Sequence, residues 1–317
     1  MRSIPKHVQL EEIKCPNGCG TSDKTILTGS DNLHDLPGEY QIVMCTTCKL
    51  QRTSPRPTAD TIGYYYPQDY GPYNDSIFKE NKSRGFKAII RNILRLNYRV
   101  LPSIEIGRML EIGCSTGSYM ELAKSKGWHV EGIEYSNEPA RIARDKGFTV
   151  HTGSIETAPT PKNRYEIIVA WMVMEHFHDP HLVLNKIKAW IKPNGYFVFL
   201  VPNANSISRK LFKQLAYDIE LPRHLFHYTP ESLEVLTKKC GWKIEKIVHQ
   251  RNAFTFLKSI EVWSRKKKKI RLNRFIIWFN SSPKTSKIRT LLHFLFGLTK
   301  QSGRIEVWAK PLAPLKD

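Results

Sequence analysis

The 317-residue sequence lacks any run of about 20 apolar residues, so we expect no helix that spans a membrane. Internal repeats and low-complexity blocks are also missing, and residues 1–12 lack the apolar core of a signal peptide. Acidic residues are scarce, because 29 Asp and Glu stand against 49 Lys and Arg and leave a net charge of +20. With 41% apolar residues, a chain of this length can form one α/β domain with smaller modules attached. We therefore expect a cytoplasmic globular protein.

Cysteines are few as well, and four of the six form two close pairs. Cys15 and Cys19 are separated by 25 residues from Cys45 and Cys48. Two such pairs, joined by a hairpin-length segment, can converge into the four-thiolate site that structural zinc prefers. The alternatives are free thiols or two disulfides, which need an oxidising compartment. The spacing predicts a zinc-ribbon-like module over residues 1–60, with structural zinc on these four cysteines.

The most informative segment is Arg108–Tyr119, which reads R-M-L-E-I-G-C-S-T-G-S-Y. A short apolar strand ends at Ile112, a turn with Gly113 and Gly117 follows, and a helix pattern begins immediately after it. Small residues let backbone N–H groups approach a ligand closely, and the start of a helix favours negative charge there. The segment therefore predicts the first strand, turn and helix of a nucleotide-binding α/β fold.

Two carboxylates near this turn indicate which kind of ligand it binds. Glu134 ends the next apolar strand, 21 residues after Gly113, where a carboxylate can accept both hydroxyls of a ribose. Glu111 stands two residues before Gly113, which disfavours a pyrophosphate and favours a cationic ligand. The alternative is an ordinary tight turn between a strand and a helix, with no ligand.

The pattern E-x-G-x-x-x-G resembles motif I of the class I methyltransferases that depend on S-adenosylmethionine (SAM), with Ser115 in place of the middle glycine. The resemblance implies a Rossmann-like α/β domain over residues 105–254, with a seven-stranded, mostly parallel sheet whose final strand lies in 301–317. It also implies SAM as cofactor. The residues expected to bind it are Glu111, Gly113, Ser115, Gly117, Glu134, Ser154, Ile155 and Trp171.

The order of three segments along the chain indicates a smaller group within these methyltransferases. A cysteine-rich start, the stretch 64–70 with four tyrosines, and then the glycine turn are similar to bacterial methyltransferases with an N-terminal putative zinc-binding domain. That group includes sugar C-methyltransferases and enzymes encoded with surface-polysaccharide genes. It implies a sugar, nucleotide sugar or glycan acceptor. Residues 61–104 are expected to form a Tyr-rich and helical linker, in which Tyr66 lines the active site or packs on the catalytic domain.

Histidines supply the candidate proton acceptors, because imidazole titrates near neutrality. His224 is the favoured general base and His176 is the second candidate, while His227 is expected to face the helix that follows it. Sugar C-methyltransferases of similar sequence carry an acid before this histidine, and here that residue is Arg223. We therefore expect O-methylation rather than C-methylation, with Arg223 available to bind a phosphate or carboxylate of the acceptor.

A second metal site is not expected. Some ubiquinone-pathway O-methyltransferases look similar around Glu175-His176 but carry a further acid three residues earlier, where this chain has Met172.

Two alternative functions stay open. An RNA methyltransferase would hold RNA through the zinc module and basic segments, although the sequence lacks an Asn/Asp-Pro-Pro-Tyr/Phe motif or a cysteine in 171–177. A SAM-fold scaffold without activity would keep the cofactor motifs and lose turnover.

Residues 255–300 hold most of the unbalanced charge. They contain twelve Lys or Arg and one acid, Glu261, and twelve minus one leaves +11 in 46 residues. Basic and apolar clusters alternate there, which predicts a basic amphipathic helical insertion between the last two strands. The segment 86–100 shows a similar pattern. Such helices either pack on the domain with solvated basic faces, contact the anionic inner face of a membrane or, as a weaker alternative, contact nucleic acid.

Overall fold

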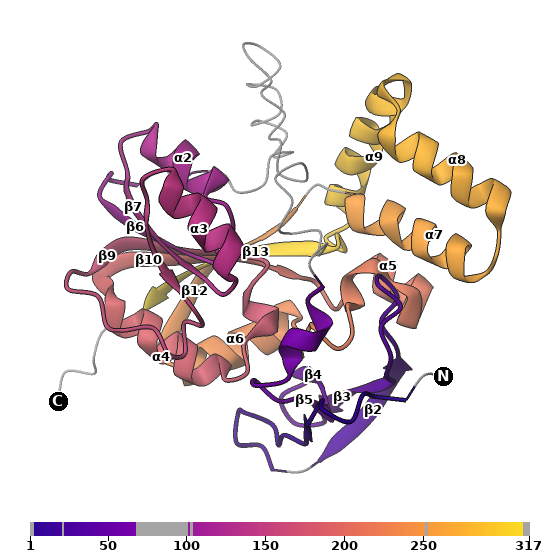
Figure 1. The fold of residues 1–317 in the computed structure, drawn as a ribbon, viewed down its shortest axis with the longest axis horizontal. Helices are drawn as coiled ribbons and strands as arrows, with labels where there is room; N and C mark the ends of the chain where they lie inside the picture. Colours follow the sequence, from indigo (N-terminus) through magenta and orange to yellow (C-terminus); the bar gives the residue numbers. More distant parts are fainter. Residues whose placement is uncertain (1–2, 21, 68–100, 102–103, 251–252, 313–317) are drawn as a thin grey trace.

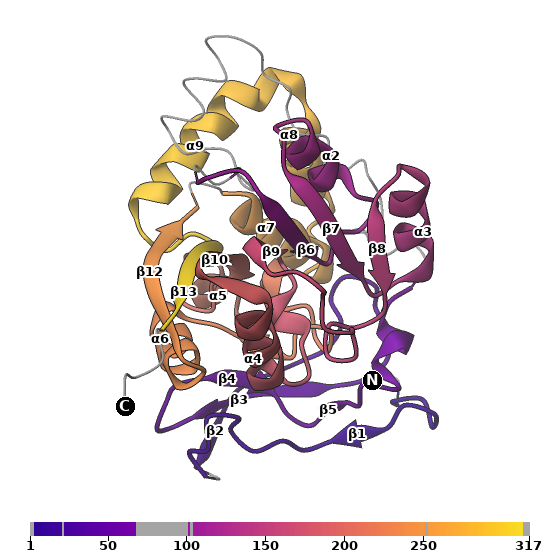
Figure 2. The ribbon, with the colours of Figure 1, turned by 90° about the vertical axis from the view of Figure 1, so that its left-hand side faces the viewer.

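The computed structural model describes residues 3–20, 22–67, 101, 104–250 and 253–312. Its centre is a seven-stranded sheet in the order β12-β13-β10-β9-β6-β7-β8, in which every strand is parallel to the others except β13 (Figures 1 and 2). The strands are β6 (Arg108–Ile112), β7 (His129–Glu134), β8 (Thr149–Thr152), β9 (Tyr165–Trp171), β10 (Ile191–Pro202), β12 (Trp242–His249) and β13 (Arg304–Pro311). The predicted Rossmann-like methyltransferase fold is confirmed.

Side-chain alternation along β9 explains how helices cover both faces of the sheet. Ile168 and Ala170 belong to one buried cluster, which includes α4 (Pro180–Trp190) and α6 (Pro230–Lys239). Ile167 and Val169 belong to the opposite cluster, together with α2 (Ser118–Lys124) and α3 (Asn137–Asp145). The central strand is therefore buried on both faces, as its continuous apolar sequence indicates.

The basic segment between β12 and β13 folds as three helices, as the sequence predicts. They are α7 (Phe254–Lys266), α8 (Ile270–Ser281) and α9 (Ser286–Leu298), with a 3₁₀ turn, η7 (Pro283–Thr285), before the last one. The three helices form a lobe at one end of the sheet (Figure 1). Across the described ranges, no helix combines the length and the apolar character that a membrane span requires.

The N-terminal module contains two small sheets. One pairs β1 (Leu10–Glu11) with β5 (Arg56–Pro57), and the other has the order β11-β4-β3-β2. Its members are β2 (Asp23–Gly29), β3 (Tyr40–Cys45), β4 (Gln51–Thr53) and β11 (Phe226–His227). The sequence gives no sign that β11, which comes from the catalytic half of the chain, completes this sheet. The module and the catalytic domain therefore share a sheet, and Figures 1 and 2 show them packed side by side.

β10 is irregular near its start, because its pairing with β9 shifts register between Ile191 and Tyr196. The helix expected over 86–100 lies outside the described residues, and so does most of the linker 61–104. Within that linker, η1 (Ile62–Tyr65) is a 3₁₀ turn whose Ile62 and Tyr65 side chains are buried. Three further short elements connect β10 to β11: α5 (Ile207–Phe212), η5 (Lys213–Leu215) and η6 (Tyr217–Ile219).

Candidate functional site

The glycine turn after β6 adopts a conformation that requires small residues. Gly113, Ser115 and Gly117 have φ of 72°, 49° and 81°, in the left-handed region that L side chains rarely adopt. At Gly113 a Cβ atom would lie 2.5 Å from Cγ2 of Val173, so no larger residue fits. Val173 follows β9, and the turn after β6 therefore touches the loop that leads to His176. The cofactor turn and the histidine region are neighbours in space.

Glu134 ties the turn to the end of β7. Its carboxylate accepts hydrogen bonds from the backbone N–H groups of Ser115 at 2.8 Å and Ser136 at 2.9 Å. It is buried, and burial raises its pKa although these amide donors oppose the shift. Glu111 is also buried, directly before the turn. Two carboxylates beside a glycine turn suit a ligand that combines a ribose with positive charge, so this donor set fits SAM.

The other predicted cofactor residues lie at the neighbouring strand ends. Ser154 follows β8 and is half-buried, its hydroxyl accepts from the backbone N–H of Glu156 at 3.1 Å, and Ile155 is buried in the core. The backbone of Gly153 donates to the Glu134 carbonyl at 2.8 Å, which holds this loop against β7. Trp171 ends β9, is buried and lies edge-on to Tyr119 with ring centroids 5.3 Å apart. Their contact with a cofactor remains a prediction.

His224 lies in a buried acidic pocket. Its Nδ1 is 2.9 Å from the carbonyl oxygen of Asp218, which only accepts, so Nδ1 carries the proton and Nε2 keeps its lone pair. Nε2 lies 3.9 Å from a carboxylate oxygen of Glu175 and 3.9 Å from one of Glu220. Burial, together with the nearby Arg209 charge, lowers the pKa of His224 to about 3. A neutral imidazole therefore faces two carboxyl groups.

His176 and Tyr66 complete this group of side chains. The rings of His176 and His224 meet edge-to-face with centroids 4.8 Å apart. Nδ1 of His176 lies 3.0 Å from both the Arg223 carbonyl and the Tyr66 hydroxyl, so it donates to the carbonyl with the phenol beside it. Burial lowers the pKa of His176 to about 3. The structure thus brings the three predicted catalytic side chains, His224, His176 and Tyr66, together.

Glu175 is the site residue that sequence reasoning missed. It is fully buried, and within the part of the chain that the structure describes neither carboxylate oxygen has a hydrogen-bond partner. Burial, together with the nearby Glu220 charge, raises its pKa to about 8. At neutral pH this carboxyl therefore holds a proton beside the unprotonated Nε2 of His224. The sequence does contain a signal for Glu175, because this charged residue stands four positions after the end of a continuous apolar strand.

The same cluster has the spacing of a metal-binding set. Single ligand atoms of Glu175, His176 and His224 lie within 4.8 Å of one another. The sequence argument against a second metal rested on Met172, and it did not consider His224 as a ligand. The cluster is therefore able to act in proton transfer or to hold a cation, and metal content distinguishes the two.

Two expectations for this region are wrong. Arg223 does not reach toward an acceptor, because it is fully buried and binds the carboxylate of Asp31 through two nitrogens at 2.9 Å. His227 does not face the following helix, because its ring lies between Thr53 of β4 and Arg209 of α5 at 3.2 and 3.0 Å. Both side chains instead join the N-terminal module to the catalytic domain.

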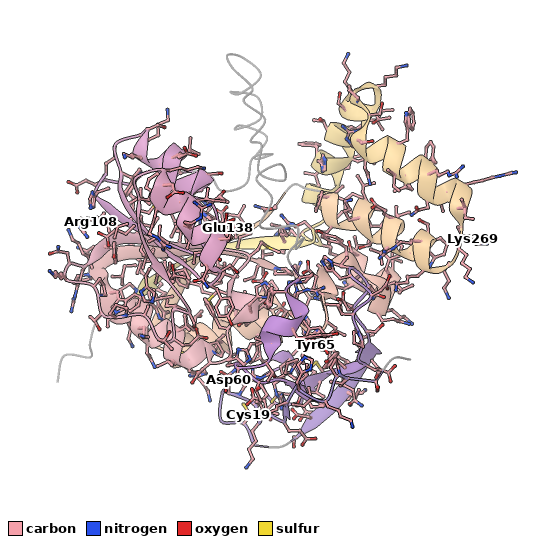
Figure 3. The ribbon with its side chains drawn as sticks, in the orientation of Figure 1. Cys19, Asp60, Tyr65, Arg108, Glu138 and Lys269 are labelled. Atoms are coloured by element: carbon pink, nitrogen blue, oxygen red, sulfur yellow. The ribbon has the colours of Figure 1, made fainter. Side chains whose placement is uncertain are left out.

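The four module cysteines converge as predicted. Their sulfur atoms lie within 4.8 Å of one another, and each of the six cysteines in the chain is a free thiol. Zn–S bonds of about 2.3 Å place tetrahedral sulfurs roughly 3.8 Å apart, so the set fits zinc. Figure 3 shows Cys19 on the module side that faces away from the three-helix lobe. A bound zinc would crosslink the turn at Cys15 and Cys19 to the turn at Cys45 and Cys48.

Replacing Cys45 and Cys48 together with serine is expected to remove the zinc and to lower the free energy of unfolding by several kcal/mol, because structural zinc contributes directly to folding. Metal analysis and thermal unfolding of the purified full chain measure both effects. Cys240→Ser, a buried thiol outside the cluster, is the matched control and is expected to keep one zinc per chain. A wild-type chain that folds without any metal would contradict the structural role.

Comparison with known proteins identifies the family of the chain. A profile described as "Methyltransferase domain" matches residues 81–247, which is more than half of the chain. The chain belongs to this methyltransferase family. Family and fold together support an enzyme that depends on SAM.

The curated relatives are distant. The chain is 29% identical over 123 residues to the ubiquinone biosynthesis O-methyltransferase of Bordetella avium, which is 36% of this chain and 51% of that protein. It is 27% identical over 143 residues to the C-methyltransferase NovU of Streptomyces niveus, covering 43% and 33%. A solved SAM-dependent methyltransferase from Mesorhizobium loti is 15% identical with a TM-score of 0.45, covering 66% and 93%. The chain spans about half the length of the first of these relatives.

Proposed function

We propose that the chain transfers the methyl group of SAM to a hydroxyl of a sugar, nucleotide sugar or glycan at the cytoplasmic face of the membrane, in surface-polysaccharide biosynthesis. When bound, SAM supplies an electrophilic methyl group on a sulfonium. Glu111, Glu134 and the turn at 113–117 would hold it. The observation that carries the proposal is the contact of Val173 with Gly113, because it joins the cofactor turn to the cluster of His176, His224 and Glu175.

His224 is the proposed proton acceptor. Its Nε2 lone pair faces Glu175, and the Asp218 carbonyl fixes the ring in the tautomer that this role needs. A proton that arrives on Nε2 is stabilised once Glu175 is ionised, so the pair accepts one proton as a unit. Tyr66 and His176 stand beside it, where they can orient the hydroxyl of an acceptor.

The position of Arg223 gives no reason to prefer methylation of oxygen over methylation of carbon. Arg223 no longer argues for O-methylation, since it is paired with Asp31, and the acid missing from the sequence position before His224 is supplied in space by Glu175 and Glu220. O-methylation is proposed because several curated relatives carry that name, whereas one is named a C-methyltransferase. The sugar acceptor is proposed from the order of cysteine module, tyrosine stretch and glycine turn.

Calorimetric titration with SAM and S-adenosylhomocysteine, with metal content read on the same sample, tests the cofactor assignment. We expect saturable binding of one equivalent per chain. The acceptor class is then tested by release of S-adenosylhomocysteine with nucleotide sugars and with RNA, and by NMR of the product, which separates O-methyl from C-methyl groups. No cofactor binding by the folded, zinc-loaded chain would refute the enzyme, and turnover with RNA alone would refute the acceptor.

A further inference from the structure

In the part of the chain that the structure describes, α7 is the helix of the three-helix lobe that contacts the domain most extensively, through α5, η5 and η6. α7 buries Thr255, Leu257, Ser259, Val262 and Ser264, and the ring of Phe256 lies 5.6 Å from that of Phe212 in α5. α8 buries only Ile276, and α9 buries none of its residues. Figures 1 and 2 show α8 and α9 on the side of α7 that faces away from the N-terminal module. Most of the surface of these two helices is therefore open.

That open surface is apolar along α9. Ile288, Leu291, Leu295 and Leu298 are 55%, 58%, 47% and 56% exposed. Their spacing of i, i+3, i+7 and i+10 places all four side chains on one stripe of the helix. Soluble proteins rarely leave such a contiguous aliphatic stripe in water unless it binds something.

α8 adds aromatic residues and positive charge. Phe275 and Trp278 are 52% and 49% exposed, and their rings lie 5.8 Å apart. Arg271 and Arg274 lie on the same exposed arc of the helix, since positions three and four apart are neighbours. The apolar and cationic side chains are thus interleaved on one surface rather than separated on two faces.

After Glu261 in α7, the charged side chains of the lobe are all positive. No Asp or Glu occurs between Glu261 and Glu306, whereas twelve Lys or Arg lie in that interval. Arg265 and Lys266 turn inward to Asp35, and Arg289 donates to the carbonyl of Ser282 at 2.8 Å. Lysines 267–269 are exposed, and no carboxylate of the described chain lies within 4.0 Å of them. Figure 3 shows Lys269 at the tip of the α7–α8 hairpin.

We propose that α8 and α9 form a docking surface for a membrane that contains anionic phospholipids. Cationic side chains bind headgroups, while the aliphatic stripe and the exposed aromatic rings enter the boundary between headgroups and acyl chains. A second copy of the chain fits this surface less well, because two lobes of the same charge repel each other. Nucleic acid fits less well too, because its phosphate backbone offers nothing to the stripe of α9. The docking is independent of the acceptor that the catalytic domain uses.

Vesicle sedimentation of the full-length chain tests the proposal, with phosphatidylcholine vesicles that contain or lack phosphatidylglycerol. We expect binding to the anionic vesicles only, and weaker binding as salt is added. Lys268→Glu with Lys269→Glu is expected to weaken binding at least about tenfold, since each cation near an anionic surface contributes on that scale. Leu291→Asn with Leu295→Asn is expected to weaken it by a similar factor.

Control variants carry substitutions of the same kind outside the three-helix lobe. Lys162→Glu with Arg164→Glu reverses two exposed charges in the loop before β9, and Leu182→Asn replaces a leucine of α4 that is 43% exposed. We expect both to bind anionic vesicles as the wild type does, and circular dichroism confirms that every variant is folded.

Three results would overturn the proposal. The first is that the wild type does not bind anionic vesicles. The second is tight RNA binding that Lys268→Glu with Lys269→Glu abolishes and the α9 leucine variant leaves intact, which would make the lobe a nucleic-acid surface. The third is a dimer that the leucine variant dissociates, without vesicle binding, which would make it a self-association surface.

Discussion

Glu134→Ala is expected to weaken SAM and S-adenosylhomocysteine binding by about 10- to 100-fold. The carboxylate lies at the end of β7, where it is placed to accept ribose hydroxyls, and a hydrogen bond to a charged group contributes about 1.5–3 kcal/mol. The same carboxylate accepts from the backbone N–H groups of Ser115 and Ser136. Its loss therefore also leaves the glycine turn without the contact that fixes its shape.

The matched control is Glu138→Ala, on the helix that follows. Glu138, labelled in Figure 3, is exposed and pairs with Arg141 at 2.8 Å, so its removal deletes a carboxylate that is not among the predicted cofactor residues. Titration calorimetry of the wild type and both variants gives the dissociation constants. If Glu134→Ala binds within twofold of the wild type while remaining folded, the carboxylate does not contact the cofactor.

The sequence was sufficient where the structure depends on local signals. The strand before Gly113, the helix that begins at Ser118 and the acid that ends β7 all follow from periodicity and turn chemistry over a few residues. The cysteine pairs were equally readable, because two close pairs of ligands have few arrangements that satisfy a metal. Each of these features is set by neighbours in the chain.

The sequence was insufficient where a side chain finds its partner far along the chain. Arg223 pairs with Asp31 across 192 positions, and the two residues of β11 pair with β4 across more than 170. No local pattern near Arg223 indicates whether it points to solvent or into the core. For the same reason the carboxyl group beside His224 was sought in the preceding residue, when the fold supplies it from Glu175 after β9.

Glu175→Gln is expected to stabilise the fold at pH 8 and to lower turnover. The pKa of this buried carboxyl is raised from 4.5 to about 8, so the folded state holds a proton that the unfolded state has lost. Between these two values, rising pH therefore reduces stability, and below pH 4.5, where both states are protonated, this pH-dependent cost disappears. At about 1.4 kcal/mol per pKa unit over roughly 3.5 units, the variant is expected to gain on the order of 4 kcal/mol at pH 8 and little at pH 4.

The turnover of Glu175→Gln is expected to fall, although its stability at pH 8 is expected to rise. If Glu175 and His224 accept one proton as a pair, the wild-type rate rises with pH toward about 8, as Glu175 ionises, and then levels off. Glu175→Gln is expected to lose that rise. His224→Ala is expected to reduce turnover by about 10²- to 10⁴-fold with cofactor affinity unchanged. The two effects are expected to be non-additive in the double variant, because both side chains serve one proton transfer.

Chemical unfolding at pH 4 and pH 8, combined with pH–rate profiles, separates a proton-transfer role from a purely structural one. Glu220→Gln is the comparison, since Glu220 also lies 3.9 Å from His224 but has its partner in Arg223 at 3.6 Å. Glu220→Gln removes this ion pair and is therefore expected to lower the free energy of unfolding, whereas Glu175→Gln is expected to raise it at pH 8. An active His224→Ala variant would refute the proton acceptor, and a second metal equivalent lost in that variant would show that the cluster binds a cation instead. A pH–rate profile unchanged in Glu175→Gln would leave this carboxyl a buried structural group with no part in the reaction.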